Sequence, residues 1–430
     1  MLKRFSIILI MVLLLIGISN NVLGSEKYTT TSTINEVTVN WEYELNDSNE
    51  IANLKCTNPA DLTGNIAIPD TLDEKAVTSL ANEAFKSATA ITGVTIPNTV
   101  KEIGMWSFSG CTNLSAVNLG SVEKISEQSF KNCTALTSIK IPKTLNRGAS
   151  GTPFLGCTNL ITIELEEGMT VVPSYLCSGT AITEITIPST AKEIEISAFS
   201  GCTNLSTVNL GSVEKISEQS FKNCTALTSI KIPKTLNKGA SGAPFLGCTN
   251  LTTIELEEGM TVVPSYLCSG TAITEITIPN SVKGIDLWAF SNCSELKKIT
   301  ILDNVEDMGD YISNNTDTVF QNHNEGLTIY CYEDSLAAKY AIKYQIKYVY
   351  LQKPTSSKNE EEQQEDTKQE QKNEEKPTTK EEKTEKDDNT IAKEKLPNTG
   401  MTVQNVVAAI IILSFSIICY RKYKKVKDIK

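Results

Sequence analysis

A near-exact internal repeat constrains this chain more than any other feature. Residues 109–188 and 200–279 differ at only four positions, at an offset of 91 residues. Inside each copy a shorter unit recurs, because an apolar anchor residue returns every 22 to 24 residues. The anchors that we assign are Phe85, Phe108, Phe130, Phe154, Leu176, Phe199, Phe221, Phe245, Leu267 and Phe290. A unit this short cannot bury its apolar side alone, so the pattern predicts a solenoid of stacked turns.

The text after most anchors predicts one short strand in each unit. It reads Phe-x-x-Cys-x-x-Leu-x-x-Ile-x-Ile, as in the unit of Phe130. There Ile139 and Ile141 alternate with Lys140, which indicates a strand with two residues facing the core. We expect strands of successive units to align in a parallel sheet, which a proline directly after the strand, such as Pro142, would end. Helix-forming text is scarce, so the return side should hold short strands, 3₁₀ turns and loops.

One segment, ITIPSTAKEIEISAFSGCTNLSTVNL, resembles the BspA-like leucine-rich repeats of bacterial and protist surface proteins, with their Ile-Pro, Ala-Phe and Cys-x-x-Leu positions. The resemblance implies a β-rich leucine-rich repeat solenoid over residues 64–326, with the tandem copies at 90–180 and 181–271. It also implies an N-terminal cap at 25–63, with a hairpin of Val37–Leu45 and Ile51–Cys56, and a strand-helix-strand C-terminal cap at 327–352. The text LGSVEKI replaces Ile-Pro in two units and predicts a local irregularity there.

Seven cysteines share one position in their units and would form a ladder along the core: Cys111, Cys133, Cys157, Cys202, Cys224, Cys248 and Cys293. No Cys-x-x-Cys or Cys/His pair exists, and a ladder does not converge on a tetrahedral ion, so we expect no metal and no cofactor. Parallel side chains favour packing as small apolar residues over disulfides, although disulfides stay an alternative in an exported protein. Cys177 and Cys268 lie off the ladder, and we expect these two thiols to be the exposed ones.

Groups for catalysis are sparse in this sequence. The only histidine, His323, is far in sequence from the ladder thiols, and no GxSxG, HExxH or P-loop motif occurs. The acidic runs at 164–167 and 255–258 are expected to be solvated edges, not cation sites. We therefore expect no enzymatic activity.

The outward side of the strands is the remaining candidate for a binding site. It is polar, rich in threonine and free of aromatic residues, whereas hot spots favour Trp, Tyr and Arg, so any single site should be weak and gain by repetition. The pairs Lys140–Glu164 and Lys231–Glu255 are expected to meet across neighbouring strands. The candidate ligand face consists of Thr137, Ser138, Lys140, Thr162, Glu164, Thr183, Glu184, Thr228, Ser229, Lys231, Thr253, Glu255, Thr274 and Glu275.

The two ends of the sequence predict export and anchoring. Residues 1–24 join a basic start to an apolar run, which is typical of a signal peptide cleaved between Gly24 and Ser25. Residues 353–395 are almost purely polar and charged, which predicts a disordered stalk. A basic tail at 421–430 follows an apolar segment at 401–420 that is long enough to span a bilayer of ~30 Å.

The sequence Leu396, Pro397, Asn398, Thr399 and Gly400 stands directly before that apolar segment. With the segment and the basic tail, it resembles the cell-wall sorting signal of Gram-positive bacteria. The resemblance implies that a sortase cleaves between Thr399 and Gly400 and joins Thr399 covalently to peptidoglycan, on the outer face of the cell.

The charge of the exported part bears on its partners. Residues 25–400 carry a formal net charge of −18, which argues against a nucleic-acid partner. The BspA-like resemblance implies an adhesin that binds host proteins or other cells. The alternative is a passive coat or antigenic-variation protein with a variable number of repeats.

Overall fold

A computed structural model describes residues 26–145, 151–237, 242–309 and 318–353. The chain divides into two units, 1–356 and 357–430, and all described residues belong to the first. The predicted signal peptide with Gly24 and Ser25, the stalk from residue 354, the sorting motif at 396–400, the apolar segment and the basic tail lie outside the described residues. Among the residues that are described, no helix is both long and apolar enough to cross a bilayer.

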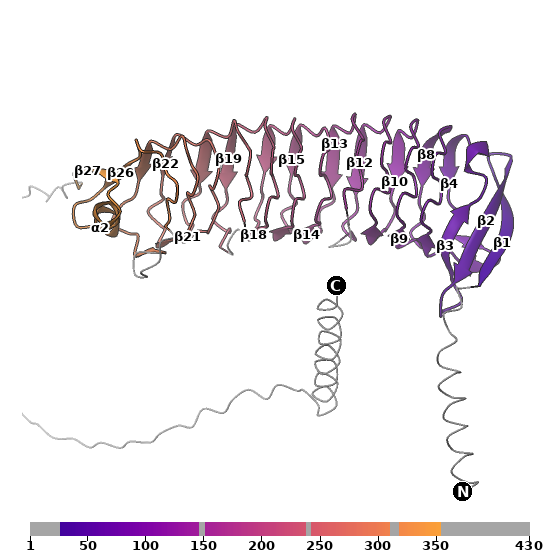
Figure 1. The fold of residues 1–430 in the computed structure, drawn as a ribbon. Helices are drawn as coiled ribbons and strands as arrows, with labels where there is room; N and C mark the ends of the chain where they lie inside the picture. Colours follow the sequence, from indigo (N-terminus) through magenta and orange to yellow (C-terminus); the bar gives the residue numbers. More distant parts are fainter. Residues whose placement is uncertain (1–25, 146–150, 238–241, 310–317, 354–430) are drawn as a thin grey trace, which may run out of the picture. The chain divides into compact units, whose positions relative to one another are not determined.

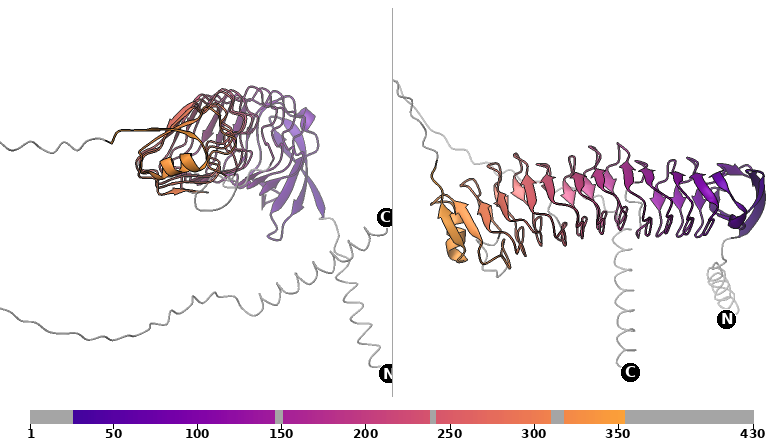
Figure 2. Two further views of the ribbon diagram at one scale, coloured as in Figure 1. Left: turned by 60° about the vertical axis from the view of Figure 1, so that its left-hand side comes forward. Right: turned by 90° about the horizontal axis from the view of Figure 1, so that it is seen from above.

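The predicted parallel-strand solenoid is confirmed. Each turn brings one strand to the upper side of the molecule in Figure 1, and the right-hand view of Figure 2 shows these strands side by side. We call them the front strands. They are β4 (Gly64–Ala67), β8 (Ile91–Thr95), β10 (Ala116–Asn118), β12 (Ser138–Ile141), β13 (Thr162–Leu165), β15 (Glu184–Thr186), β17 (Thr207–Asn209), β19 (Ser229–Ile232), β20 (Thr253–Leu256), β22 (Glu275–Thr277), β24 (Lys298–Thr300), β26 (Thr328–Cys331) and β27 (Lys347–Tyr350).

Most of the described turns carry a strand of two residues on the return side, in line with the scarcity of helical sequence. These back strands also pair in parallel, in three groups. They are β7 (Ser79–Leu80), β9 (Glu102–Ile103), β11 (Lys124–Ile125), β14 (Val171–Val172), β16 (Glu193–Ile194), β18 (Lys215–Ile216), β21 (Val262–Val263), β23 (Gly284–Ile285) and β25 (Asp307–Met308).

Both ends of the stack are capped. At the N-terminal end β1 (Lys27–Ile34), β2 (Val37–Leu45) and β3 (Ile51–Cys56) form an antiparallel meander, so the expected hairpin is present with one strand that we did not predict. A 3₁₀ turn (Pro59–Asp61) and the small hairpin of β5 (Thr71–Leu72) and β6 (Lys75–Ala76) follow. At the other end α2 (Leu336–Lys343) connects β26 to β27, and the Ser335 side chain caps its first turn by accepting a hydrogen bond from the Ala338 amide.

The core is a column of anchor side chains that stack from turn to turn. Ring centroids of Phe85 and Phe108 lie 5.1 Å apart with the rings nearly parallel, and Phe199 and Phe221 lie 5.0 Å apart. Trp41 packs edge-on against the first ring of the column, Phe85. Each turn therefore buries its anchor only when its neighbours are in place, which gives the solenoid its cooperativity.

Two of our anchor assignments are wrong by one residue. In most turns with a phenylalanine anchor, the anchor amide donates to the carbonyl of the residue before the next anchor, as Phe108 does to Ser129. In the turns of Leu176 and Leu267, the equivalent bond is made by the residue that follows the leucine. The Cys177 amide donates to the Ala198 carbonyl, and the Cys268 amide donates to the Ala289 carbonyl. Leu176 and Leu267 are buried as well, so their apolar character alone could not distinguish them from the true anchors.

The front strands do not form one continuous sheet. Pairing joins β4, β8 and β10, then β12 and β13, then β15 and β17, then β19 and β20, and finally β22, β24, β26 and β27. Where a front strand runs into Ile-Pro, as at Ile96-Pro97, it pairs with the next strand. The breaks follow strands that run into Leu-Gly, as at Leu119-Gly120, or Leu-Glu, as at Leu165-Glu166. The LGSVEKI text therefore marks a real interruption, in both copies.

A local hydrogen bond explains why the strand ends at Leu-Gly. Gly120 has a left-handed φ of 56°, and its amide donates to the Asn118 side chain at 3.0 Å. This Asx turn bends the chain away from the extended path, whereas a proline forces the residue before it to stay extended. A Cβ at Gly120 would lie 2.5 Å from the Ile96 carbonyl oxygen, so glycine is required there.

Candidate functional site

The ladder cysteines are buried and reduced, and each thiol makes the same contact. The Sγ atom donates to the anchor carbonyl of the preceding turn, as Cys133 does to Phe108 at 3.3 Å and Cys157 does to Phe130 at 3.0 Å. Sequence reasoning treated these residues as small apolar groups and missed this role. The contacts are Cys111 to Phe85, Cys133 to Phe108, Cys157 to Phe130, Cys202 to Cys177, Cys224 to Phe199, Cys248 to Phe221 and Cys293 to Cys268.

The expectation that Cys177 and Cys268 are exposed is wrong. Both side chains have no exposed area, because each residue occupies the anchor position and points into the core. In the same turns Thr180 and Thr271 take the place of the ladder cysteine, and their hydroxyls donate to the anchor carbonyls of their own turns. From Cys111 to Cys293 this position thus holds a small side chain that can donate a hydrogen bond.

Burial makes the thiols of Cys111 and Cys202 poor nucleophiles. Desolvation raises the pKa of Cys111 to about 12 and the pKa of Cys202 to about 11, from an ordinary value of 9.0. Because the thiolate is the reactive form, these groups are unreactive near neutral pH. All eleven cysteines in the described ranges are free and buried.

His323 lies closer to the ladder than its sequence position suggested. It follows the ring of Phe320 by three residues, which is the ladder position of the last repeat turn, one turn after Cys293. The Cys293 thiol, however, donates to Cys268 in the preceding turn, and the His323 Nδ1 atom bonds to the backbone oxygen of Asn324. The geometry brings these two turns together without making a Cys/His pair.

The structure places all fourteen residues of the candidate ligand face in exposed positions on or beside the front strands. Strand β12 shows the alternation, since Ile139 and Ile141 are buried while Ser138 and Lys140 are exposed. The predicted ion pairs across neighbouring strands are confirmed, with Nζ–Oε1 distances of 2.9 Å for Lys140–Glu164 and 3.1 Å for Lys231–Glu255. Exposed pairs of this kind contribute at most about 1 kcal/mol, so they shape the surface more than they stabilise the fold.

The acidic runs next to this face bridge successive turns. Glu166 accepts a hydrogen bond from the Lys143 amide, and Glu167 accepts bonds from Ser189 and Thr190 in the next turn. The bond from the Ser189 hydroxyl holds the pKa of Glu167 below its ordinary range. Within the described ranges no cluster of His, Cys, Asp and Glu is suited to hold a metal ion.

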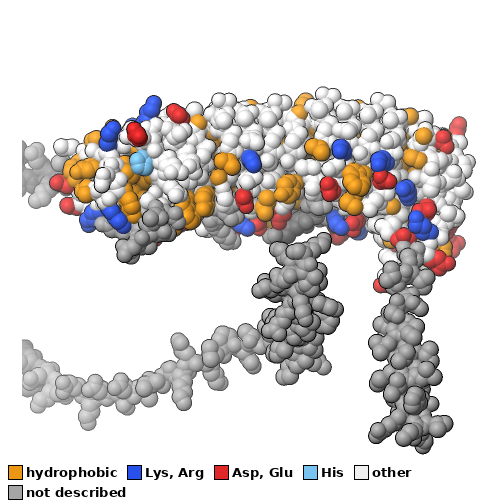
Figure 3. All heavy atoms as spheres, viewed as in Figure 1, with side chains coloured by type: hydrophobic (Ala, Val, Ile, Leu, Met, Phe, Trp, Pro, Cys, Tyr) orange, Lys and Arg blue, Asp and Glu red, His pale blue; other side chains and the backbone are white. Residues whose placement is uncertain are grey.

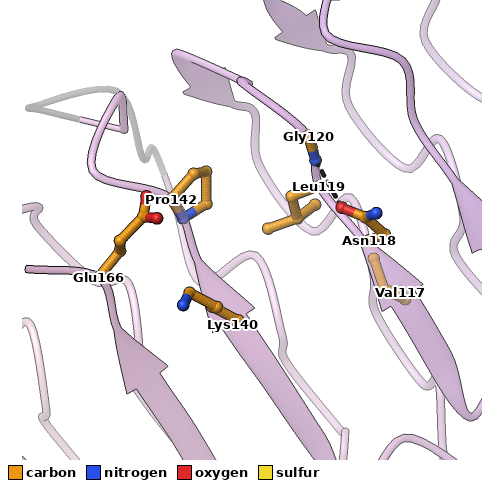
Figure 4. A pocket seen from close by; sticks show the side chains of 7 residues that line it. All are labelled: Val117, Asn118, Leu119, Gly120, Lys140, Pro142 and Glu166. Carbon is orange, nitrogen blue, oxygen red and sulfur yellow. Dashed lines mark hydrogen bonds between the residues drawn. The ribbon is translucent and has the colours of Figure 1, made fainter.

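A pocket opens in the front face where β10 fails to pair with β12. It has a volume of about 370 Å³, and Figure 4 shows its walls. One wall is the end of β10 with its Asx turn, where the Asn118 oxygen bonds to Gly120. The other wall carries Lys140 and Pro142 from β12 and its following turn, with Glu166 beyond them. This volume lies within the range of about 300–1,000 Å³ that is usual for small-molecule sites.

The tandem copy builds the same pocket again. Its volume is about 360 Å³, and its walls hold Asn209, Gly211, Lys231, Pro233 and Glu257 in the equivalent positions, 91 residues further on. A larger hollow of about 600 Å³ lies between the two, at the break between β13 and β15. The front face thus combines exposed polar strands with a repeated pocket at its Leu-Gly breaks.

Exposed apolar groups gather elsewhere. Figure 3 shows hydrophobic side chains in patches on one flank and over the end that carries α2. The exposed large hydrophobic residues include Tyr175 and Ile196, which lie on adjacent turns of the return side, and Tyr348 and Tyr350, which lie on the terminal strand β27. Sequence reasoning did not single these residues out.

Solved structures that are similar to the chain include the leucine-rich repeat protein TpLRR of T. pallidum, with 22% identity over 47% of this chain and 97% of that one and a TM-score of 0.38. They also include a leucine-rich cell surface protein of Faecalibacterium prausnitzii, with 24% identity over 73% of this chain and 97% of that one and a TM-score of 0.33. A further one is the pneumococcal vaccine antigen PcpA, with 16% identity over 76% of this chain and 100% of that one and a TM-score of 0.42. No curated protein matches the chain significantly.

A family model gives the assignment. The model of the BspA-type leucine-rich repeat region matches residues 78–206, 149–243 and 214–336, which together exceed half of the chain. These ranges contain the anchor column, the cysteine ladder and both copies of the pocket. The chain belongs to the BspA-type leucine-rich repeat family.

Proposed function

We propose that this protein is an adhesin of the cell surface, which binds host proteins or other cells through its front face. The observation that carries the proposal is the repetition of one exposed, polar strand surface over successive turns, with equivalent groups such as Thr137 and Thr228 in both copies. Each site is expected to be weak on its own, and repetition converts weak sites into useful avidity.

Display on the cell wall is a second part of the proposal. The support is the order of three sequence elements, namely the LPNTG motif at 396–400, the apolar segment at 401–420 and the basic tail. A sortase would join Thr399 to peptidoglycan, and residues 353–395 would carry the repeats outward. If Thr399→Ala leaves the protein linked to the wall after detergent extraction, this route of anchoring is wrong.

The adhesion proposal is tested with the purified chain against a panel of extracellular-matrix proteins and host cells. We expect saturable binding that falls when alternating front-face threonines in both copies are replaced by lysine. The same substitutions at exposed positions of the back strands serve as the control and should leave binding intact. A failure to bind across a broad panel contradicts the proposal.

One observation favours the alternative of a passive coat or antigenic-variation protein. The two copies differ at only four of the aligned positions, which is the degree of identity that recombination needs to change the repeat number. Variable repeat number among natural isolates, together with an absence of any ligand, would support it over adhesion.

A further inference from the structure

The two Leu-Gly breaks do more than interrupt the sheet, because each leaves a hydrogen-bond donor facing the next turn. At unbroken positions this donor is used: the amides of Ile96 and Ile187 bond to the carbonyls of Asn118 and Asn209 at 2.9 Å. The amides of Leu119 and Leu210 hold the same position before their breaks, and in the described part of the chain neither has a backbone partner. An amide that lacks its ladder partner at the edge of a pocket is a ready donor for a ligand.

Two further donors surround this amide. Asn118 uses its Oδ1 atom to accept from Gly120, and its Nδ2 atom has no partner among the described residues. Lys140 lines the same pocket and has one bond to Glu164, which leaves two of its three donors unused. The nearest carboxylate in the wall, Glu166, already accepts the Lys143 amide. The pocket therefore calls for a ligand that supplies hydrogen-bond acceptors.

The surroundings narrow the class of ligand. The strongly negative exported chain disfavours polyanions, and each pocket ammonium is already paired with a carboxylate. The walls offer no aromatic or deep apolar subsite for the side chains of a peptide. Sugar hydroxyls and acetamido carbonyls, in contrast, supply neutral acceptors at close spacing.

The repetition adds the last argument. The pockets lie at β10 and β17, which are four front strands apart, so equivalent groups are separated by on the order of 20 Å at the usual distance between strands. A polymer with a regular repeat can occupy both at once. We propose that these two pockets are subsites for one neutral, acceptor-rich polysaccharide chain, in which the Leu119 and Leu210 amides, the two asparagine amides and the two lysines bind sugar oxygens. This inference rests on the proposed function, because it assigns the ligand class of the same front face.

The test uses the whole chain and two probes, N-acetylglucosamine oligomers of two and of eight sugars, with heparin as the polyanion arm. We expect the octamer to bind about 100-fold more tightly than the dimer, because only the octamer reaches both pockets. Lys140→Ala alone should remove most of that advantage and leave dimer binding at half the stoichiometry. Lys140→Ala with Lys231→Ala should abolish binding of both.

Two sets of variants separate the pockets from general effects. Asn118→Asp with Asn209→Asp keeps the acceptor for the Gly120 amide but removes the free donor, so it should weaken binding while the fold stays intact. Lys101→Ala with Lys192→Ala removes the same charge from equivalent paired lysines on the return side and should change nothing. Binding of heparin alone, or equal octamer binding by wild type and the double lysine variant, would overturn the inference.

The outcome also distinguishes this inference from the proposed function. If the chain binds cells or matrix proteins and the pocket variants bind them equally well, adhesion stands and the glycan subsites fail. If the octamer binds through the pockets but no cell or matrix protein is bound, the subsites stand and adhesion fails.

Discussion

At the residue scale, the ladder cysteines show how a repeat fold solves a hydrogen-bonding problem. The anchor carbonyls lie in the dry core, and the amide three residues further on bonds to most of them, as the Cys111 amide does to Phe108, which leaves room for a second donor at the same oxygen. The cysteine thiol fills the space beside the anchor and donates to the carbonyl of the preceding turn. Thr180 and Thr271 at the same position also donate to an anchor carbonyl, that of their own turn, with a hydroxyl in place of the thiol.

Replacing Cys133 tests the donor role. Cys133→Ala leaves the Phe108 carbonyl without its thiol partner and opens a small cavity, so we expect a loss of about 2 kcal/mol in the free energy of unfolding. Cys133→Ser keeps a donor and should lose no more than about 1 kcal/mol. Urea denaturation measures both. Equal losses for the two variants would mean that only volume matters at this position.

The same thiols predict alkaline sensitivity. Desolvation raises the pKa of Cys111 to about 12 in the folded chain, while the unfolded thiol titrates near its ordinary value of 9.0. The folded state therefore holds its proton longer, and stability is complete below pH 9 and declines as the pH rises toward 12. The stability advantage of the wild type over Cys111→Thr should shrink by about 1.4 kcal/mol between pH 7 and pH 10. An advantage that is independent of pH contradicts this linkage.

At the scale of single strands, two residues after each front strand decide whether the sheet continues. Ile-Pro keeps the chain extended, so the isoleucine amide reaches the carbonyl of the next turn. Leu-Gly permits an Asx turn, in which the glycine leaves the extended path of the strand. A difference of two residues thus places the sheet breaks, and with them the pockets, at the same point in both copies.

Native-state hydrogen exchange tests this rule without a mutation. The amides of Ile96, Ile187 and Ile278 each donate to the next turn at 2.9 Å and should be strongly protected. The amides of Leu119 and Leu210 are expected to exchange faster, although both side chains are buried. Similar protection of the leucine and isoleucine amides would show that the breaks close in solution.

At the scale of the whole solenoid, each turn is stabilised by its two neighbours and by the caps at the ends. The anchor column ends on an edge-on ring on each side, Trp41 against Phe85 and Tyr340 against Phe320. The number of turns between the caps is therefore adjustable, provided that the register of the repeat is kept.

A deletion in register tests this property. Removing residues 109–199 joins Phe108 to Ser200 and takes out one period of 91 residues. We expect a folded protein whose urea m-value is lower by about a quarter, in proportion to the surface removed. Removing residues 109–188 instead breaks the register and should abolish the cooperative transition. A folded product from both deletions would show that stacking does not depend on register.

Much of this architecture follows from the sequence alone. The 91-residue repeat, the return of an apolar anchor and the alternation around Lys140 predict the solenoid, the front strands and the exposed face, because hydrophobic periodicity is a local property that any unit displays. The position of the irregularity was also readable, since LGSVEKI departs from the Ile-Pro pattern.

Only the tertiary structure decided the rest. Whether Leu176 or Cys177 is the anchor depends on which amide meets the carbonyl of the next turn, and both residues are apolar enough for either role. The partner of the Cys133 thiol, the closeness of His323 to the turn of Cys293 and the pockets at the breaks likewise arise between turns that are 22 to 30 residues apart in sequence. The sequence by itself determined what each turn buries, whereas the stacking of turns determined which groups meet, because hydrogen bonds between turns depend on register and distance that no single unit contains.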